Sequence, residues 1–369
     1  MNKEFYRCFR CLTPNTRPRV KFKNGICNAC INWENKKNID WNRRKKLLAK
    51  YCNKFRKSDG SFDVIVPGGG GKDSSYVAWM LKNKFNMNPL CVCVQPPLDT
   101  KIGKQNLDNF ISAGFNVIEI KPNRKVSKII AKNAFIKYGN PQLDWLFAIH
   151  AAPIRISIEF NIPFIMWGEE AESEYGGSDD LKNKTGFDLN HIKKYYRSNI
   201  NIYDLVNRKD IKKSDIYWMT LPNNQLFKKS KIFATHWSFF EKWDEHHHLK
   251  IAKKYCGLET LKGNSSGAYN NFSHIDQKMY LLHMYLAYLK FGFARATTDA
   301  SIDIRAGKMS REKGLKLAKN LDSIFPSENI NEYLKYFKMT RKTFNSSIEK
   351  FRNKKIFKKS KNKWILDES

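Results

Sequence analysis

The sequence predicts an α/β protein with a doubly wound parallel sheet, preceded by a zinc-ribbon-like four-cysteine segment and followed by a helical C-terminal region. Between residues 61 and 240, short apolar runs alternate with helical stretches, which is typical of a parallel sheet covered on both faces. Two C-x2-C pairs mark the segment before it. We therefore expect a zinc-binding segment at 1–45, an ATP-binding α/β domain at 46–240 and a helical domain at 241–369, which contributes to the substrate site.

The apolar and β-branched runs predict four strands, and amphipathic stretches between them predict helices. The strands are expected at 62–67, 90–94, 117–120 and 164–167. The helices are expected at 74–85, 107–113 and 126–138, after a basic connecting helix at 41–60. Residues 241–369 contain amphipathic helices and no convincing strand, and the basic tail 349–364 is expected to be solvated.

Charge and composition limit the classes of partner. The 67 Lys and Arg residues exceed the 35 Asp and Glu residues, which gives a net charge of +32 and favours anionic ligands. Abundant Lys, Asn and Ile in an AT-rich genome is the alternative explanation of this excess. Because the chain has no apolar run long enough to span a bilayer and no secretory signal at its start, we expect a cytoplasmic protein without membrane insertion.

The four N-terminal cysteines have the spacing of a metal site. They form the pattern C-x2-C-x15-C-x2-C, which is Cys8, Cys11, Cys27 and Cys30. Each pair supplies two thiolates from one tight turn, so together they can surround a zinc ion tetrahedrally. A complete thiolate shell indicates a structural role, and an iron–sulfur cluster is the alternative.

A glycine-rich loop follows the first strand and opens a helix. Glycine backbone N–H groups and the helix N-terminus make a cradle for phosphate, to which Lys72 adds a full charge. The pattern is neither a Walker loop nor a dinucleotide-binding fingerprint. The expected nucleotide-binding residues are Gly69, Gly70, Gly71, Lys72, Asp73, Ser74 and Ser75.

Residues 69–74, GGGKDS, resemble the SGGxDS motif of the PP-loop ATP pyrophosphatases, except that Gly69 replaces the usual serine. This resemblance implies a HUP-like doubly wound fold and cleavage of ATP between its α- and β-phosphates to adenylate a substrate oxygen. Asp73 with Glu169 or Glu170 would then hold Mg²⁺. Lys72, Asp73, Glu169 and Glu170 are the expected catalytic residues.

Further segments resemble the N-acetyl sugar amidotransferases of bacterial surface-glycan synthesis. That family is associated with converting a sugar N-acetyl group to an acetamidino group in O-antigen or flagellin glycan synthesis. The resemblance implies ammonia from a separate glutaminase similar to that of histidine biosynthesis, with a synthase-like subunit as a further partner. The segments are the Cys pairs with 16–18, 150–155 (HAAPIR), 167–170 (WGEE), 174–177 (EYGG), 290–301 (KFGFARATTDAS) and 304–305 (IR).

Charged residues in these segments are the expected contacts to a nucleotide-sugar substrate. Glu174 follows the strand end at 164–167, and Arg155 is expected at the start of a helical stretch. Arg295 and Asp299 are expected in a loop between helices, and Arg305 in the next helix. Arginine forks suit phosphate or carboxylate recognition, whereas surface ion pairs, a solvated loop and an interhelical salt bridge are the alternatives.

Two other functions remain open at this stage. A PP-loop tRNA-modifying enzyme of the thiolating type would use the same loop, with the positive charge binding RNA, although nucleic acid is not the partner we expect. A zinc-ribbon scaffold with a relic nucleotide fold is the non-enzymatic alternative. The run His246-His247-His248 does not predict a metal site, because consecutive helical side chains point in different directions.

Overall fold

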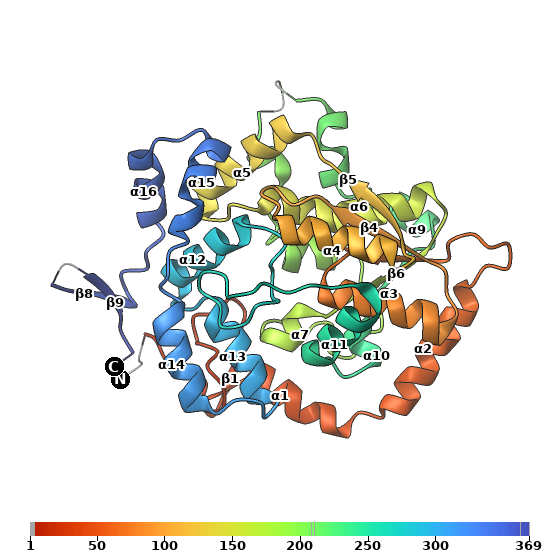
Figure 1. The fold of residues 1–369 in the computed structure, drawn as a ribbon, viewed down its shortest axis with the longest axis horizontal. Helices are drawn as coiled ribbons and strands as arrows, with labels where there is room; N and C mark the ends of the chain where they lie inside the picture. Colours follow the sequence, from red (N-terminus) through yellow and green to blue (C-terminus); the bar gives the residue numbers. More distant parts are fainter. Residues whose placement is uncertain (1–3, 208, 210, 362, 369) are drawn as a thin grey trace.

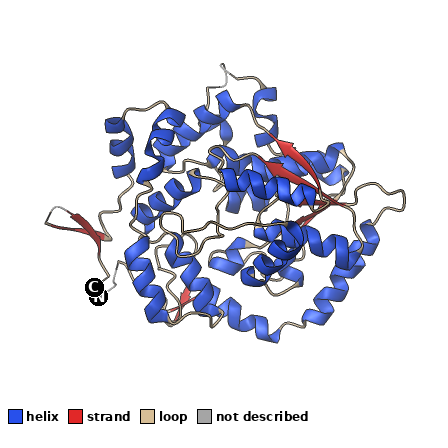
Figure 2. Ribbon diagram, in the orientation of Figure 1, coloured by secondary structure: helices blue, strands red, loops and turns tan. Residues whose placement is uncertain are grey.

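The computed structural model describes residues 4–207, 209, 211–361 and 363–368. Its centre is a five-stranded parallel sheet, with helices on both faces and a long C-terminal extension (Figures 1 and 2). The α/β class and the N-terminal cysteine cluster are therefore confirmed. Among the described residues, no helix combines the length and apolar character needed to cross a bilayer.

The N-terminal segment is a small antiparallel ribbon followed by helices. Asp40 begins the last of these helices by accepting the backbone N–H of Arg43 at 2.9 Å, as an N-cap does. The elements are β1 (Phe22–Lys23), β2 (Ile26–Cys27), α1 (Asn28–Asn35), η1 (Lys36–Asn38) and α2 (Trp41–Phe55).

The sheet has the strand order β5-β4-β3-β6-β7. Its strands are β3 (Val64–Pro67), β4 (Pro89–Val94), β5 (Asn116–Ile120), β6 (Phe164–Trp167) and β7 (Phe233–His236). The helices between them are α3 (Lys72–Phe85), α4 (Lys101–Ser112), α5 (Arg124–Tyr138), α6 (Leu143–Glu159), α7 (Ala171–Tyr175), α8 (Leu189–His191), the π-helix η2 (Ile192–Tyr196), η3 (Ile202–Asp204), η4 (Lys213–Met219), α9 (Asn224–Lys229) and α10 (Trp237–Phe240). The chain leaves β3 toward one edge of the sheet and later returns to β6 on the other side of β3.

Alternating side chains of the strands fill two cores. Val64 and Val66 pack with α2, α3 and α10 on one face, whereas Ile65 packs with α5 and α6 on the other. This period of two is the reason that the predicted strands are apolar throughout. All four predicted strands are present, and β7 is a fifth that the sequence analysis missed.

The C-terminal part is mainly helical, and it packs on the sheet region through α5. Phe135 of α5 stacks on Phe337, with ring centroids 5.0 Å apart. Its elements are α11 (Glu245–Cys256), α12 (Met279–Phe291), α13 (Arg295–Arg305), α14 (Arg311–Leu321), η5 (Ser327–Asn329), α15 (Ile330–Phe337), α16 (Arg341–Glu349), β8 (Phe357–Ser360) and β9 (Lys363–Leu366).

Three expectations about local structure were wrong. The tail is not simply solvated, because β8 and β9 form an antiparallel hairpin whose Phe357 packs against Tyr288 at 5.2 Å. Arg295 and Asp299 lie in helix α13 rather than in a loop. Arg155 lies near the end of α6, not at the start of a helix.

Candidate functional site

The glycine loop joins β3 to α3 in a conformation that requires glycine. Gly70 has φ +73°, and a Cβ atom there would lie 2.7 Å from the backbone of Asn106. Gly68 also lies in the left-handed region, with φ +108°. The loop therefore presents bare backbone at the N-terminus of α3, where N–H groups and the helix dipole favour an anion.

The loop lies at the point where the strand order reverses. β6 pairs with β3 on the side opposite β4, so the loops after β3 and β6 leave the same edge of the sheet in different directions. Ligands of open α/β sheets bind in this position. A Cβ atom on Gly168, directly after β6, would lie 3.8 Å from the Cβ of Asp73, so the two loops are in contact.

The two serines of the loop differ in what they can offer to a ligand. Ser74 is partly exposed at the start of α3. Ser75 is fully buried, and its N–H donates to the carbonyl of Gly71 at 3.0 Å. The N–H of Ser75 is therefore engaged within the loop, whereas its buried hydroxyl oxygen has no hydrogen-bond partner among the described residues.

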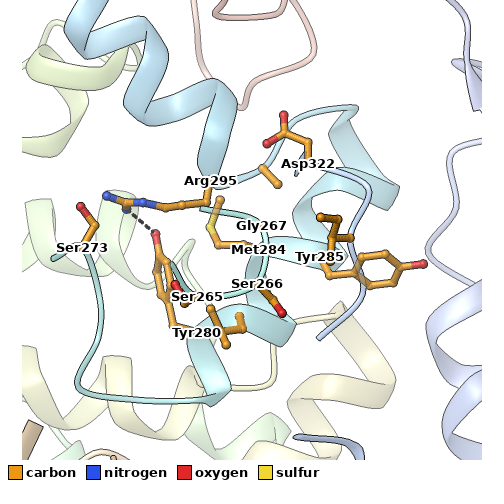
Figure 3. Close-up of a pocket in the computed structure, with 12 residues that line it drawn as sticks. Ser265, Ser266, Gly267, Ser273, Tyr280, Met284, Tyr285, Arg295 and Asp322 are labelled. Carbon is orange, nitrogen blue, oxygen red and sulfur yellow. Dashed lines mark hydrogen bonds between the residues drawn. The ribbon is translucent and has the colours of Figure 1, made fainter. Parts of the chain in front are cut away.

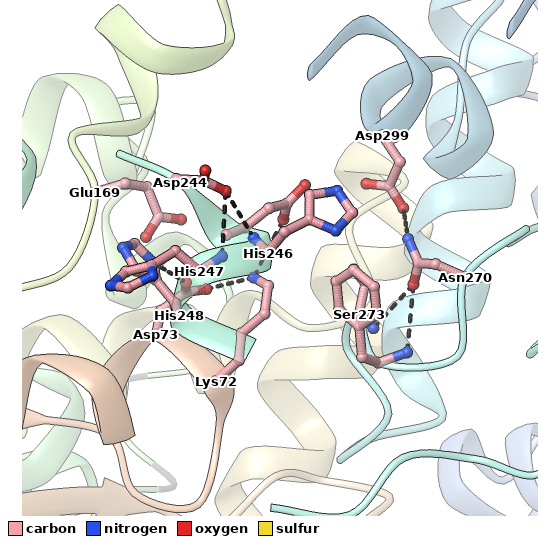
Figure 4. Close-up of polar contacts among 12 residues, drawn as sticks. Lys72, Asp73, Glu169, Asp244, His246, His247, His248, Asn270, Ser273 and Asp299 are labelled. Atoms are coloured by element: carbon pink, nitrogen blue, oxygen red, sulfur yellow. Dashed lines mark hydrogen bonds and ion pairs between the residues drawn. The ribbon is translucent and has the colours of Figure 1, made fainter. Parts of the chain in front are cut away.

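Lys72, Asp73, Glu169, Glu245 and His248 form what we call the glycine-loop cluster, and Figure 4 labels all of these residues except Glu245. Lys72 Nζ lies 2.5 Å from Asp73 Oδ2 and 3.3 Å from Glu245 Oε2. The second oxygen of Asp73 lies 3.0 Å from His248 Nδ1. Residues from α3, α11 and the loop after β6 thus meet above the glycine loop.

The charges of this cluster stabilise one another. Burial opposes the charged form of Lys72, but the carboxylates of Asp73 and Glu245 outweigh it and raise the Lys72 pKa. Burial likewise opposes the ionised form of Asp73, but Lys72 and His248 hold the Asp73 pKa well below its usual range. At neutral pH, Lys72 and Asp73, the first two residues of α3, therefore form a fixed ion pair.

Glu169 is the second acid at this point. Its carboxylate accepts the hydroxyl of Tyr175 at 3.2 Å. Burial and then the negative charge of Asp73 raise the pKa of Glu169 to about 7. A carboxyl group that titrates near neutral pH can exchange a proton during catalysis.

Glu170 has a structural task as the N-cap of α7. Its carboxylate accepts the backbone N–H groups of Glu172 and Ser173, the latter at 2.8 Å. Burial raises the pKa of Glu170 to about 7. These contacts hold α7 and give no support to a catalytic role for Glu170.

The other predicted substrate residues fall into separate groups. Glu174 forms a buried ion pair with Lys36 of the N-terminal segment. Arg305 donates to the backbone carbonyl of Glu174 at 3.2 Å and lies 3.7 Å from the sulfur of Cys11. Both therefore lie where the cysteine segment, α7 and α13 meet.

Arg295 and Asp299 pair with each other within α13. Arg295 Nε donates to Asp299 Oδ2 at 2.9 Å, and Arg295 Nη2 forms an ion pair with Oδ1 at 2.6 Å. Asn270 also donates to Oδ2, at 2.6 Å. Burial raises the pKa of Asp299 to about 6 despite this pairing. Arg295 also lines a pocket, where it donates to the hydroxyl of Tyr280 at 3.1 Å (Figure 3).

Arg155 is not brought to the glycine loop. Its Nε donates to the backbone carbonyl of Thr220 at 2.7 Å, and its guanidinium lies 3.8 Å from the ring centroid of Tyr217. The end of α6 precedes β6, so Arg155 lies toward the edge of the sheet opposite the glycine loop. Its position gives no support to a substrate contact.

The four cysteines converge as the spacing predicts. Cys8 and Cys30 have their sulfurs 3.9 Å apart, and the sulfurs of Cys11 and Cys27 are 3.6 Å apart. A tetrahedral zinc ion with bonds of about 2.3 Å keeps its sulfurs about 3.8 Å apart. All four side chains are buried, so the cluster is compatible with a structural metal such as zinc.

Sequence reasoning missed the contribution of α11. Its Asp244 cap positions Glu245 beside Lys72, and the histidines after it point to different partners. His246 Nε2 lies 2.8 Å from Asp303 of α13, whereas His248 contacts Asp73. The expectation that the histidine run does not chelate one ion together agrees with this divergence.

One further group could hold a cation. Ligand atoms of Glu245, His246 and Asp303 lie within 4.8 Å of one another, beside Lys72. Tyr269 donates to the other oxygen of Asp303 at 2.8 Å. No residue of this group could be found from the sequence, because α11 and α13 meet only in the folded chain.

Two comparisons with known proteins concern parts of the chain. Residues 266–368 match the family model described as LPS biosynthesis protein WbpG-like, C-terminal domain. The match includes Arg295, Asp299 and Arg305, and it supports the predicted relation to lipopolysaccharide and glycan biosynthesis proteins. An uncharacterized protein of Methanocaldococcus jannaschii is 29% identical over 109 residues, which are 29% of this chain and 38% of that protein.

Proposed function

We propose that the chain is an ATP-dependent amidotransferase of the PP-loop type, which converts an N-acetyl group of a nucleotide-linked sugar to an acetamidino group. The observation that carries this proposal is the fixed Lys72–Asp73 ion pair, which stands at the start of α3 and faces Glu169 where the strand order reverses. The WbpG-like match of residues 266–368 supports a role in lipopolysaccharide or flagellin glycan synthesis. We place the protein in the cytoplasm, where ATP and nucleotide sugars are available.

The proposed reaction has two displacement steps. The acetamide oxygen attacks the α-phosphate of ATP, which forms an O-adenylyl imidate and releases pyrophosphate. Ammonia then adds to the imidate carbon, and AMP leaves with the former acetamide oxygen. Loop N–H groups and Lys72 would stabilise the charge that develops on pyrophosphate, and they need no rearrangement to do so.

Glu169 has the properties of the proton acceptor in the second step. Attacking ammonia becomes positively charged and must lose a proton, and a carboxylate with a pKa of about 7 is well matched to accept it. Tyr175 orients this carboxylate by donating its hydroxyl. Ammonia would come from a separate glutaminase, with or without a synthase-like subunit.

The acidic groups of the site fit a divalent cation. Asp73 raises the pKa of Glu169, which means that the two carboxylates repel each other, and a cation between them would remove this repulsion. Glu169 would then serve as a ligand while the cation is bound and could accept a proton only in its absence. Hard carboxylate oxygens are ligands that Mg²⁺ prefers. When bound with ATP, Mg²⁺ would neutralise phosphate charge.

The thiolating alternative receives less support from the structure. Such chemistry needs a reactive thiolate near the loop, and Cys91 and Cys93 lie on β4, the strand that pairs with β3. Burial raises the pKa of both, that of Cys93 to about 12. These thiols would be protonated at neutral pH and are poor nucleophiles.

An isotope experiment tests the proposed reaction. The protein is incubated with ATP, Mg²⁺, ammonium chloride and N-acetylated nucleotide sugars whose acetyl oxygen is a heavy isotope. We expect an amidine product together with AMP that carries the heavy oxygen. AMP without the label would exclude attack by the acetamide oxygen, and adenylation that depends on tRNA instead of sugar would favour the thiolating alternative.

A further inference from the structure

A second pocket lies between the cysteine segment and the C-terminal helices. We call it the arginine pocket; Arg17, Tyr175, Phe293, Thr298, Ser301 and Arg305 line it. Arg17 comes from the loop between the two cysteine pairs, Tyr175 from the end of α7, and Arg305 from the end of α13. Three distant parts of the chain therefore build it.

The lining of this pocket is positively charged. Arg17 and Arg305 both face it, and none of the described residues that line it is acidic. Burial and then the nearby charge of Arg305 lower the pKa of Arg17. Two guanidinium groups that repel each other in a common cavity would be stabilised by an anion between them.

The arginine pocket is a built site rather than a chance gap. Arg17 Nε donates to the backbone carbonyl of Gly176 at 2.8 Å, and its guanidinium lies 5.3 Å from the ring centroid of Phe293. Arg305 is held by the backbone carbonyl of Glu174. Each guanidinium has N–H groups beyond these contacts, and the fork geometry suits an oxyanion.

Hydroxyl groups add further donors and acceptors. Ser301 is 2% exposed, and its oxygen accepts the N–H of Leu12 at 3.3 Å, which leaves its hydroxyl hydrogen for a ligand. Thr298 also lines the pocket, and because its hydroxyl donates to the carbonyl of Ala294 at 3.0 Å, it offers a ligand only an acceptor. Phe293 supplies an apolar wall.

Tyr175 connects this pocket to the glycine-loop cluster. Its side chain lines the pocket, and its hydroxyl donates to Glu169. The negative charge of Asp73 in turn raises the pKa of Glu169. Only the side chain of Tyr175 separates the arginine pocket from Glu169. A ligand anchored in the pocket could therefore extend past Tyr175 toward the proposed adenylation site.

We propose that the arginine pocket binds an oxyanion group, a phosphate or a carboxylate, of the sugar acceptor. The assignment to the acceptor rests on the proposed function, whereas the anion site itself does not. The four-cysteine cluster then does more than stabilise its own segment, because it fixes the loop that carries Arg17. A phosphate and a carboxylate would both supply the oxyanion that the two guanidinium groups recognise, and separate probes distinguish the two groups.

Binding measurements on the intact protein test this site. Inorganic phosphate, glucuronate and UDP-N-acetylglucosamine are titrated separately by calorimetry into the wild type and into Arg17→Gln. We expect saturable binding that weakens about tenfold or more in Arg17→Gln, since a lost charged hydrogen bond costs about 1.5–3 kcal/mol. Stronger binding of glucuronate than of phosphate and UDP-N-acetylglucosamine would assign the carboxylate, and the reverse order would assign the phosphate.

Arg10→Gln is the matched control. Arg10 belongs to the same segment and pairs with Glu34 at 2.9 Å on the surface, so this variant removes the same charge outside the pocket. We expect it to bind the probes like the wild type. Equal weakening in both variants would show a general charge effect and would overturn the proposal, as would the absence of saturable binding of all three probes.

Two additions keep the result interpretable. If Arg17→Gln does not fold, Ser301→Ala removes a donor from the pocket, and unchanged binding in a folded Ser301→Ala variant would overturn the proposal. Lys72→Ala separates this inference from the proposed function. If anion binding persists in Lys72→Ala and still depends on Arg17, the anion site is supported even where no amidine is formed. If Arg17→Gln forms the amidine with an unchanged KM for the acceptor, the assignment of the site to the acceptor is overturned.

Discussion

The glycine-loop cluster and the arginine pocket meet at Tyr175, yet their charges are arranged differently. In the cluster, Lys72 lies against Asp73 and Glu245, so its positive charge is matched before any ligand arrives. In the pocket, Arg17 and Arg305 face each other without an acidic lining residue among those described. The first region is preorganised around its own ion pairs. In the second, the cysteine sulfurs outweigh burial and raise the pKa of Arg305, whereas burial and Arg305 lower that of Arg17, the group that the proposed anion would stabilise.

The largest effect is expected from a substitution in the glycine-loop cluster. Lys72→Ala removes the charge that we propose stabilises departing pyrophosphate, and it leaves Asp73 and Glu245 without their common partner. We expect AMP formation to fall about 100- to 1000-fold, as with the loss of a preorganised donor in other enzymes. Lys82→Ala is the control, because Lys82 lies on the same helix but is exposed, where it donates to the carbonyl of Gly114 and lies 5.1 Å from the ring centroid of Phe115. Wild-type activity in Lys72→Ala would contradict the assignment.

The next prediction concerns Glu170, which lies between the two regions. Its pKa rises from 4.5 to about 7 on folding, so between these values the folded protein keeps a proton that the unfolded chain has lost. Glu170 therefore stabilises the fold fully below pH 4.5, and this contribution disappears as the pH rises through 7. Glutamine does not titrate, so we expect Glu170→Gln to gain up to about 3 kcal/mol relative to the wild type between about pH 5 and pH 8.

Unfolding titrations with denaturant at several pH values measure this difference. Glu34→Gln is the control, because Glu34 is exposed and Lys37 lowers its pKa. Glu34 is then ionised in both states above pH 5, and the difference between this variant and the wild type should not change with pH. A flat difference for Glu170→Gln as well would show that Glu170 is not protonated in the folded protein.

A smaller effect is expected where the cysteine cluster supports the second region. Cys27→Ser removes one of four sulfurs and should lower the bound metal, because a three-thiolate shell holds zinc less tightly. Loosening the loop with Arg17 should then weaken phosphate binding about tenfold, whereas ATP binding at the glycine loop should persist. Metal analysis and separate titrations check this result.

Cys52→Ser is the corresponding control. Cys52 is buried in the core between α2 and the sheet, outside the four-cysteine cluster. It should leave the metal content unchanged. Unaltered phosphate binding in a metal-free Cys27→Ser variant would show that the two features are independent.

The two regions also differ in how far the sequence predicts them. Gly70, Lys72 and Asp73 are neighbours in the chain, and the loop conformation follows from local sterics, so the motif alone indicates the site. The same holds for the two Cys pairs. His248 lies 175 residues from Asp73, and only the packing of α11 on α3 brings them together. Contacts of this kind leave no local pattern.

The misread elements have physical causes as well. The threonines of α13 suggested a loop, but the Arg295–Asp299 pair one turn apart and the bond from Thr297 to Asp322 stabilise a helix there. The tail 349–364 is rich in lysine, yet Phe357 and its packing against Tyr288 fix a hairpin. In both cases, a tertiary contact overrides local composition.

Arg155 provides the smallest effect, and it contrasts with Arg17, which the sequence analysis did not single out. Its guanidinium is engaged by Thr220 and Tyr217, away from both regions, whereas Arg17 faces a cavity. Arg155→Met should therefore lower the free energy of unfolding by about 1–3 kcal/mol through the lost hydrogen bond and cation–π contact. KM for the acceptor should not change, because no atom of Arg155 lines the described pockets. A raised KM for the acceptor with an unaltered free energy of unfolding would return Arg155 to the substrate site. Such a result would require α6 to move toward the glycine loop, and the packing of α6 in the core beneath the sheet opposes this movement.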